Sequence, residues 1–343
     1  MICKTGWVGV SVLLLTLGLL IGGAGSKDGR MSAFAQASPS PQANYVLLIV
    51  LEGVGPSSIH LGDMPILQKL AREGAVSWHA TSIMPPLPVP AMASLLTGLT
   101  VKKHRITPEW ETYDFSRSFL RAPTVFDYLD LAGGRDTALF FMDERFYQLA
   151  RPEIYIDKQI CGYAKPECNP STLVLYVKDY LAKVLDKGGH GFRLFDVPGL
   201  LVAHFPQAAR AGAKYGWQSS QYRQALQTID TAVAEMLQLY QEIGALGETM
   251  VIITGLTGSP ISSPGENGSH EGSETKDGLR VIPWIAWGAN VKSGYEIRRP
   301  VSILDTAATI MEALGLETHT EWESHALSEI FQRVPERRTT GNE

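Results

Sequence analysis

The sequence has little cysteine and little charge for its length, and each shortage narrows the possible functions. Only 3 of 343 residues are cysteine, which excludes a fold stapled by many disulfides. Charged residues make up 19%, and a formal net charge of −5 argues against nucleic acid or an anionic membrane surface as a partner. No internal repeat is visible. Hydrophobic residues, at 45%, are sufficient for a substantial core, and about 290 residues fit one large domain.

The first 35 residues read as a leader rather than as part of the fold. Lys4 precedes an apolar stretch over residues 5–24, and an Ala-Phe-Ala step at 33–35 offers a cleavage site. The stretch is also long enough to be an uncleaved membrane anchor. Both alternatives predict an extracytoplasmic protein that is secreted, periplasmic or anchored by residues 5–24. The expected parts after the leader are a Pro/Ser linker at 36–44, an α/β domain at 45–330 and a flexible tail at 331–343.

The few cysteines fit an oxidising compartment. Cys3 lies in the leader, whereas Cys161 and Cys168 flank the loop-like segment GYAKPE. A small disulfide loop between Cys161 and Cys168 is favoured over two unpaired thiols. A metal-binding role for this pair is the least favoured alternative.

Apolar runs that alternate with amphipathic segments predict an α/β fold. The run from Tyr45 to Leu51 is continuously apolar and is followed by Glu52-Gly53, which is typical of a strand buried on both faces. The pattern predicts a three-layer α/β/α arrangement with a largely parallel central sheet, and an irregular segment at 143–170. The expected strands are 45–51, 137–142, 199–205, 249–254 and 281–287, and the expected helices are 64–73, 90–96, 123–132, 171–185, 219–243 and 302–314.

Three motifs in the opening unit point to a family. They are Met64-Pro65-x-Leu67-x-x-Leu70-Ala71-x-x-Gly74, then Pro90-x-x-Ala93-Ser94-Leu95-Leu96-Thr97-Gly98, then His104-Arg105-Ile106. In order and spacing they resemble the alkaline phosphatase superfamily, closest to its type I phosphodiesterase/nucleotide pyrophosphatase and sulfatase branches. Later segments, including RVIPWIAWGANVKSG and SILDTAATIMEALGL, extend the resemblance over residues 45–316. It implies an alkaline phosphatase-like fold.

The resemblance also implies a metal-dependent hydrolytic site, and most of its residues are replaced in this chain. Active members hold one or two divalent metals and attack with a Thr, Ser or modified Cys at a helix amino terminus. The nucleophile position is Pro88, whose side chain has no heteroatom. The strand-one Asp is replaced by the longer Glu52, and the late His has a counterpart in His270. The lost ligand positions are Ala209, Ala213, Leu256 and Thr257.

The surviving residues have structural as well as functional interpretations. Glu52 is expected to cap the Met64 region or to pair with a nearby Lys or Arg, His270 to be a solvated loop histidine and His104 to be a packing and turn residue. Because the ends of parallel strands converge, His204 is expected to approach Glu52 and His270. A replacement metal site from Glu52, His204 and His270 is the less favoured alternative, because affinity depends on the number and charge of the ligands.

These residue types predict a pseudoenzyme that acts in ligand or partner binding, with no resident cofactor. The expected partners are another protein or a small anionic ligand, and not nucleic acid. The alternative is a phosphoric or sulfuric ester hydrolase with a rebuilt site that uses zinc or manganese. A third reading is a non-catalytic subunit of an active paralogue. The substrate and the oligomeric state stay open.

Overall fold

A central mixed sheet organises the fold of the computed structural model, which describes residues 41–60, 64–112, 119–132, 135–149, 157–160, 169–185, 196–260 and 278–332. Its eight strands lie in the order β4-β3-β5-β1-β6-β7-β2-β8. The predicted α/β class is therefore confirmed. The strands are β1 (Tyr45–Glu52), β2 (Ala75–Thr81), β3 (Thr137–Phe141), β4 (Asp157–Ile160), β5 (Leu200–Phe205), β6 (Thr249–Thr257), β7 (Val281–Gly288) and β8 (Tyr295–Glu296).

Most neighbouring strands run parallel. β1 pairs in parallel with β5 on one side and with β6 on the other. β7 is the exception, since it runs antiparallel to both β6 and β2. The expected, largely parallel sheet is thus confirmed with one reversed strand, and the carboxyl ends of β1, β5 and β6 meet at one edge.

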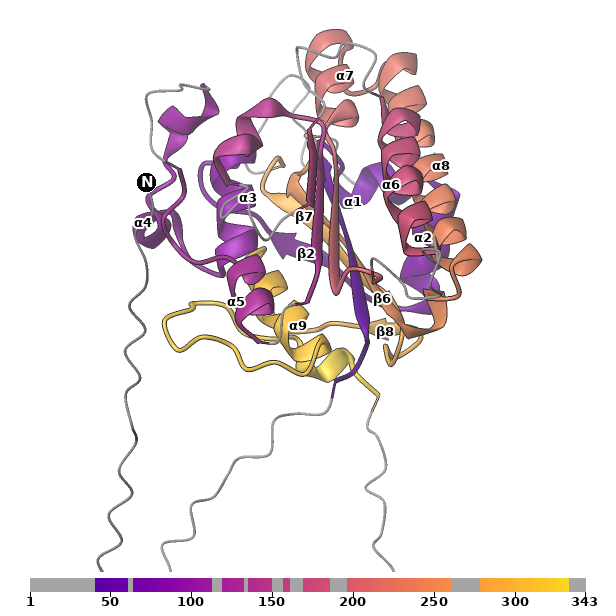
Figure 1. Ribbon diagram of the computed structural model, residues 1–343. Helices are drawn as coiled ribbons and strands as arrows, with labels where there is room; N and C mark the ends of the chain where they lie inside the picture. The colour runs from indigo at the N-terminus through magenta and orange to yellow at the C-terminus, as the bar shows by residue number, and fades with distance from the viewer. Residues whose placement is uncertain are drawn as a thin grey trace, which may run out of the picture. The chain divides into compact units, whose positions relative to one another are not determined.

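Helices cover both faces of the sheet (Figure 1). One face carries α3 (Pro88–Thr97), α5 (Val125–Leu131) and α9 (Asp305–Ala313), and the other carries α2 (Pro65–Glu73), α6 (Pro170–Leu185) and α8 (Ser220–Glu242). The shorter elements are α1 (Pro56–Ser58), α4 (Val101–His104), α7 (Gln207–Tyr215) and the 3₁₀ helices η2 (Pro108–Glu111), η3 (Glu144–Leu149), η5 (Leu246–Glu248) and η6 (Ser328–Ile330).

Strand β1 supplies side chains to both hydrophobic cores. Val46, Leu48 and Val50 lie in the core under α3 and α9, and the alternate residues Leu47 and Ile49 lie in the core under α2 and α8. Side chains of successive strand residues point to opposite faces, so every side chain of a strand that is covered on both sides is buried in a hydrophobic core. This explains the unbroken apolar run in the sequence.

Several elements differ from the sequence prediction. β2 and α7 were not expected, and the segment 143–170 is not wholly irregular because it contains η3 and β4. In β2, the polar residues Ser77 and His79 interrupt the apolar pattern, and the pairing with β7 shifts register there. The helix pattern over 219–243 predicts Ala225 and Leu237 on the apolar face, but both are only half-buried, and Leu226, Ala232 and Leu239 belong to the buried face of α8.

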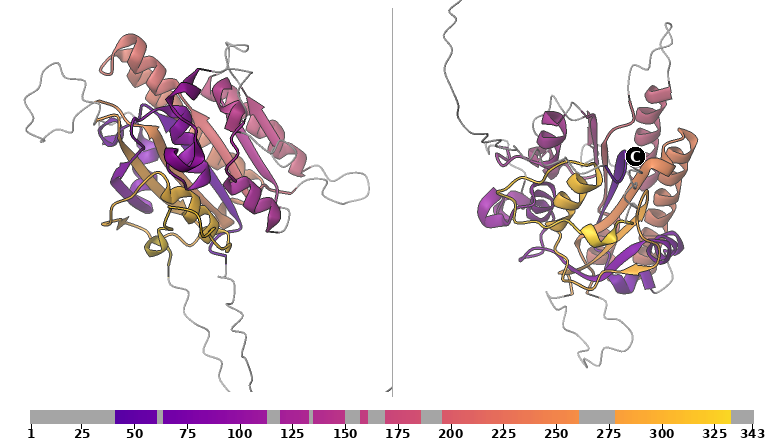
Figure 2. Two further views of the ribbon diagram at one scale, coloured as in Figure 1. Left: turned by 90° about the vertical axis from the view of Figure 1, so that its left-hand side faces the viewer. Right: turned by 90° about the horizontal axis from the view of Figure 1, so that it is seen from below.

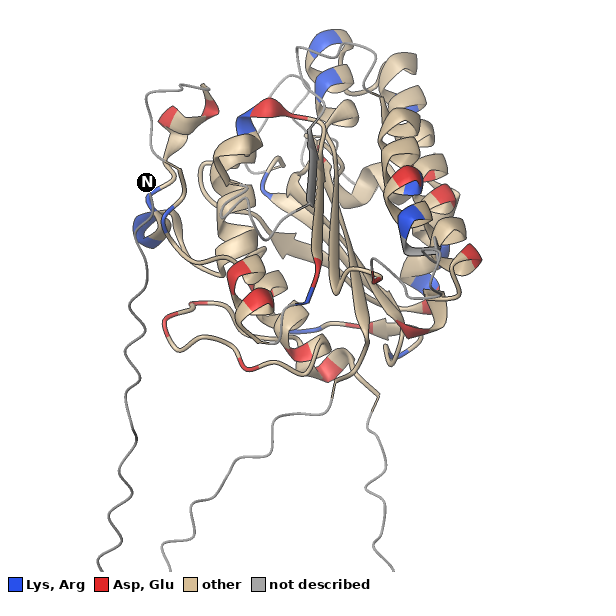
Figure 3. Cartoon of the chain, in the orientation of Figure 1, with Lys and Arg blue, Asp and Glu red and all other residues tan. Residues whose placement is uncertain are grey.

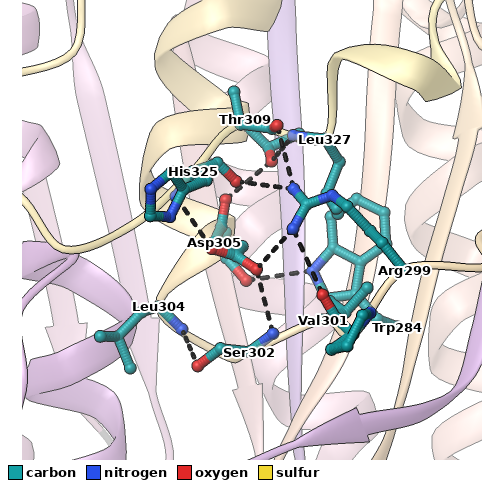
Figure 4. A network of polar contacts seen from close by, with 12 residues as sticks. Trp284, Arg299, Val301, Ser302, Leu304, Asp305, Thr309, His325 and Leu327 are labelled. Atoms are coloured by element: carbon teal, nitrogen blue, oxygen red, sulfur yellow. Dashed lines mark hydrogen bonds and ion pairs between the residues drawn. The ribbon is translucent and has the colours of Figure 1, made fainter.

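The segment after β8 is fastened to α9 by buried polar contacts (Figure 4). Asp305 Oδ2 accepts a hydrogen bond of 3.0 Å from the Ser302 N–H, and its Oδ1 accepts one of 2.9 Å from the His325 N–H. Thr309 Oγ1 accepts a third from the Leu327 N–H at 3.0 Å. Figure 2 shows this segment in yellow on the side of α9, and the Glu323 N–H reaches the Gly98 carbonyl at the end of α3. The C-terminal segment therefore holds α9 and α3 together.

Charge is mixed on the outer helices. Both signs of charge occur on α6, whereas α8 has one Arg near its start and only acidic residues after it (Figure 3). No helix of the described residues is long and apolar enough to cross a membrane. The leader, the pair Cys161 and Cys168, His270 and the tail after residue 332 lie outside the described residues.

Candidate functional site

The candidate site lies where β1, β5 and β6 end and where α3 begins. Glu52 is the last residue of β1, His204 is the penultimate residue of β5, and Thr257 ends β6. Pro88 is the first residue of α3. The structure therefore brings together three positions that the family resemblance singles out, Glu52, Thr257 and Pro88, with His204, which the convergence of strand ends predicts.

Glu52 and His204 form a buried pair. His204 Nε2 lies 2.7 Å from Glu52 Oε1, and the two residues are 0% and 4% exposed. The ring of Phe146 packs on His204 with ring centroids 4.7 Å apart. His204 Nδ1 has no hydrogen-bond partner within the described ranges. Nε2 and Oε1 are both atoms that could ligate a metal, and here they bind each other instead.

The positions that lost their ligands are filled by packing and backbone contacts. Ala209 lies against Gly53 so closely that a Cβ on Gly53 would come within 2.5 Å of the Ala209 Cα. Leu256 is fully buried in the core, and Ala213 is exposed on α7. Thr257 Oγ1 accepts a hydrogen bond of 3.0 Å from the Gly53 N–H. None of these four positions presents a free donor atom.

The amino terminus of α3 is capped by a carboxylate from η2. The Val89 N–H donates a hydrogen bond of 2.7 Å to Glu111 Oε1. Because free N–H groups and the helix dipole attract anions, this end of a helix is a ready anion site. Here a carboxylate of the chain itself, Glu111, accepts the hydrogen bond from the Val89 N–H.

Arg145 fixes that carboxylate in place. Its guanidinium forms an ion pair with Glu111, and it also bonds both Asp143 oxygens at 2.9 and 2.6 Å. Arg210 lies 3.5 Å from Asp143 on the other side and donates to the Met142 carbonyl at 2.9 Å. The four charges form one chain, Glu111–Arg145–Asp143–Arg210, that starts at the amino terminus of α3.

The pKa values in this chain follow burial and pairing. Burial raises the pKa of Glu111, against the lowering effects of the Val89 N–H and Arg145. Burial also acts to raise the pKa of Asp143, but the hydrogen bonds and charge of Arg145 outweigh it and lower the pKa. Burial acts to lower the pKa of Arg145, and the two carboxylates reverse this and raise it. Arg145 therefore stays charged between them.

Ser94 and His104 form a second pair that resembles a nucleophile and its base. Ser94 Oγ lies 2.9 Å from His104 Nε2. His104 Nδ1, however, accepts a hydrogen bond of 3.0 Å from the Ile106 N–H, so the ring proton lies on Nε2 and is donated to Ser94. Burial lowers the pKa of His104 to about 4, and both residues are almost fully buried. The pair packs the end of α3 and has no free base to offer.

The donor set does not fit a catalytic metal of the family's kind. The residues described here contain no group of three or more His, Cys, Asp or Glu arranged to hold a metal ion. Glu52 and His204 bind each other, and the lost positions offer no charged or imidazole donor. His270 lies outside the described residues, so its position relative to Glu52 and His204 is not described.

Sequence reasoning missed the residues that close the site, namely Glu111, Asp143, Arg145 and Arg210. Asp143 carried one usable signal, because it comes shortly after the buried strand β3. Residues placed there gather at the carboxyl edge of a parallel sheet. Glu111 and Arg145 lie in short 3₁₀ helices that leave no periodic pattern in the sequence.

Comparisons with known proteins support the family resemblance. The family model described as type I phosphodiesterase/nucleotide pyrophosphatase matches residues 46–258. Steryl-sulfatase of Rattus norvegicus is 26% identical over 142 residues, which cover 37% of this chain and 25% of that protein. Arylsulfatase K of Danio rerio is 26% identical over 105 residues, covering 31% of this chain and 20% of the other. The chain thus matches a quarter or less of each relative's length.

Solved structures share the fold at low sequence identity. Murine ectonucleotide pyrophosphatase/phosphodiesterase 5 aligns with a TM-score of 0.63 at 11% identity, over 84% of this chain and 100% of that one. A 2-O GAG sulfatase aligns with a TM-score of 0.61 at 14% identity, over 84% of this chain and 74% of that one. Both the phosphodiesterase and the sulfatase branches are represented among these neighbours.

Proposed function

Because this chain belongs to the type I phosphodiesterase/nucleotide pyrophosphatase family of the alkaline phosphatase superfamily, we propose that it is a non-hydrolytic member. It keeps the fold and acts by binding a ligand or a protein partner. The leader predicted at residues 1–35 supports an action outside the cytoplasm.

The hydrogen bond from the Val89 N–H to Glu111 carries the proposal. A hydrolase of this family needs the start of α3 open to the oxygens of an ester, because backbone N–H groups there stabilise the charge that develops. In this chain the Glu111 carboxylate takes that position and Arg145 neutralises it. The site resembles one that already contains its anion.

The neighbouring residues support the same conclusion. Pro88 offers neither a nucleophilic atom nor an N–H at the first position of α3. Glu52 and His204 satisfy each other rather than leave an open coordination position. The chemical requirements for ester hydrolysis are therefore unmet at three separate points.

Metal content and turnover test the proposal together. We expect the chain, purified without chelator, to carry no stoichiometric metal and to show no shift in melting temperature on titration with zinc or manganese. Hydrolysis of bis(4-nitrophenyl) phosphate and of 4-nitrophenyl sulfate should stay at the buffer rate. Pro88→Thr should remain equally inert, because a hydroxyl alone restores neither the metal nor an open anion site.

The opposite result would establish the alternative, a metal-dependent ester hydrolase with a rebuilt site. Tight binding of one metal per chain, with turnover lost in Glu52→Ala or His270→Ala, would overturn the proposal. Glu109→Ala is the control, since Glu109 is an exposed carboxylate of η2 that bonds Thr107.

A further inference from the structure

A pocket of about 460 Å³ opens at the edge of the sheet that is formed by β2 and β8. Side chains from α2, β2 and β8 line it, together with His60 after α1. Its volume falls within the range of small-molecule sites, which is about 300–1,000 Å³. Strands β6 and β7 separate β2 from β1, so this pocket is distinct from the closed site around Glu52.

Aromatic rings form much of the pocket wall. Trp78 is half-buried on β2, and the ring of His60 packs against it with centroids 4.4 Å apart and planes at 55°. Tyr295 of β8 is also half-buried, and Lys292 Nζ lies 4.8 Å from the centre of its ring. These neighbours hold the rings in place, and Trp78 and Tyr295 still line the pocket. Fixed rings of this kind give a ligand contact area at little entropic cost.

Two opposite charges line the same pocket. Arg72 from α2 and Glu296 from β8 are both exposed, and neither makes an ion pair or a side-chain hydrogen bond with any described residue. Gln68 is held by a hydrogen bond of 2.5 Å from its Nε2 to the Ile59 carbonyl. The wall therefore offers a forked cationic donor, an anionic acceptor and a positioned amide.

We propose that this pocket binds a neutral sugar ring. A pyranose has an apolar face of C–H groups that stacks on an aromatic ring, here Trp78 or Tyr295. Its hydroxyls both donate and accept, so they match Glu296 and Arg72 at the same time. One Arg and one Glu cancel in charge, which favours a neutral ligand over an anion or a cation. The proposal does not rest on the loss of hydrolysis at the closed site.

Saturation-transfer NMR with free monosaccharides tests the site. The probes are glucose, galactose and mannose as neutral sugars, with glucuronic acid and glucosamine as their charged counterparts. We expect transfer to the ring C–H protons of at least one neutral sugar, with an affinity on the order of 1 mM. Trp78→Ala should abolish the transfer, and Arg72→Gln or Glu296→Gln should weaken binding about tenfold.

Tyr215→Ala is the matched control, since Tyr215 is an aromatic residue that is 50% exposed on α7, outside the pocket. It should bind the sugar as the unmodified chain does. Absence of transfer to every neutral sugar would overturn the proposal, as would undiminished transfer in Trp78→Ala or a preference for the charged sugars. If thermal denaturation shows that Trp78→Ala does not fold, the variant Glu296→Gln, changed at an exposed residue, decides the question, and unchanged sugar binding in it would overturn the proposal.

Discussion

The Val89 N–H and the Glu111 carboxylate lie in hydrogen-bond contact at 2.7 Å, and this contact closes the start of α3. The two residues come from different elements, α3 and η2. Their contact replaces an external anion with an internal one, because the carboxylate offers the same kind of oxygen acceptor as a phosphate or sulfate ester. Mutation of Glu111 would remove this internal anion, and its effect on anion binding can be measured.

Removing the internal anion should let an external one bind. Glu111→Ala frees the Val89 N–H and one side of Arg145, so inorganic sulfate should stabilise this variant more than the unmodified chain. At a sulfate concentration ten times the dissociation constant, the expected gain in unfolding free energy is about 1.4 kcal/mol. The measurement is melting temperature against sulfate concentration at constant ionic strength. Glu109→Ala should respond as the unmodified chain does, and equal responses from all three proteins would refute the idea.

Arg145 should matter more for stability than Arg210. Arg145→Met leaves Glu111 and Asp143 without their shared partner, and we expect a loss of about 3 kcal/mol in unfolding free energy. Arg210→Met should cost about 1 kcal/mol or less, because its side chain is 49% exposed and lies 3.5 Å from Asp143. Urea denaturation of both variants at neutral pH measures the difference. Similar losses would show that the ion-pair chain is not centred on Arg145.

His104 should make the fold sensitive to mild acid. Burial lowers its pKa in the folded state from 6.5 to about 4, against the opposing charge of Glu323. Between these values the unfolded chain binds a proton that the folded chain does not, so stability is full above pH 6.5 and falls as the pH drops. One pKa unit corresponds to about 1.4 kcal/mol, so the His104 contribution lost near pH 4 is about 3 kcal/mol.

Urea denaturation between about pH 7 and about pH 4.5 measures this dependence. His104→Gln should flatten part of the slope while lowering stability at neutral pH, since the bonds to Ser94 and Ile106 are altered. His79→Gln, a change at an exposed histidine of β2, should leave the slope as it is. An unchanged slope in His104→Gln would assign the acid sensitivity to other groups.

The sequence predicted the parts of the fold that follow from strand patterns and from the parallel arrangement of strands. The strand from Tyr45 could be recognised because both of its faces are buried, and the approach of His204 to Glu52 follows from two neighbouring parallel strands. The closure of the site was not predictable in this way. Glu111 contacts Val89 across 22 positions and Arg145 across 34, and only the packing of η2 and η3 on α3 determines these contacts.

Gly53 should tolerate a side chain far less than Gly244 does. Both have a positive φ, +72° and +74°, so alanine at either position carries a similar backbone penalty, about 1–2 kcal/mol. A Cβ on Gly53 would also meet the Ala209 backbone at 2.5 Å, whereas nothing lies within 4 Å of one on Gly244. Gly53→Ala should therefore cost at least about 2 kcal/mol more than Gly244→Ala in urea denaturation. Equal costs would show that α7 moves away freely.

The central place of β1 in the sheet has a consequence for how the protein is made. β1 leaves the ribosome early, yet Gly53 at its end bonds to Thr257, which follows 204 positions later. At about 5–20 residues per second, the ribosome needs roughly 10 to 40 seconds to supply that partner. Throughout this time the edge of β1 that pairs with β6 stays open, although β5 can already pair with the other edge. This edge of the nascent sheet is therefore open to chaperones until β6 has been synthesised.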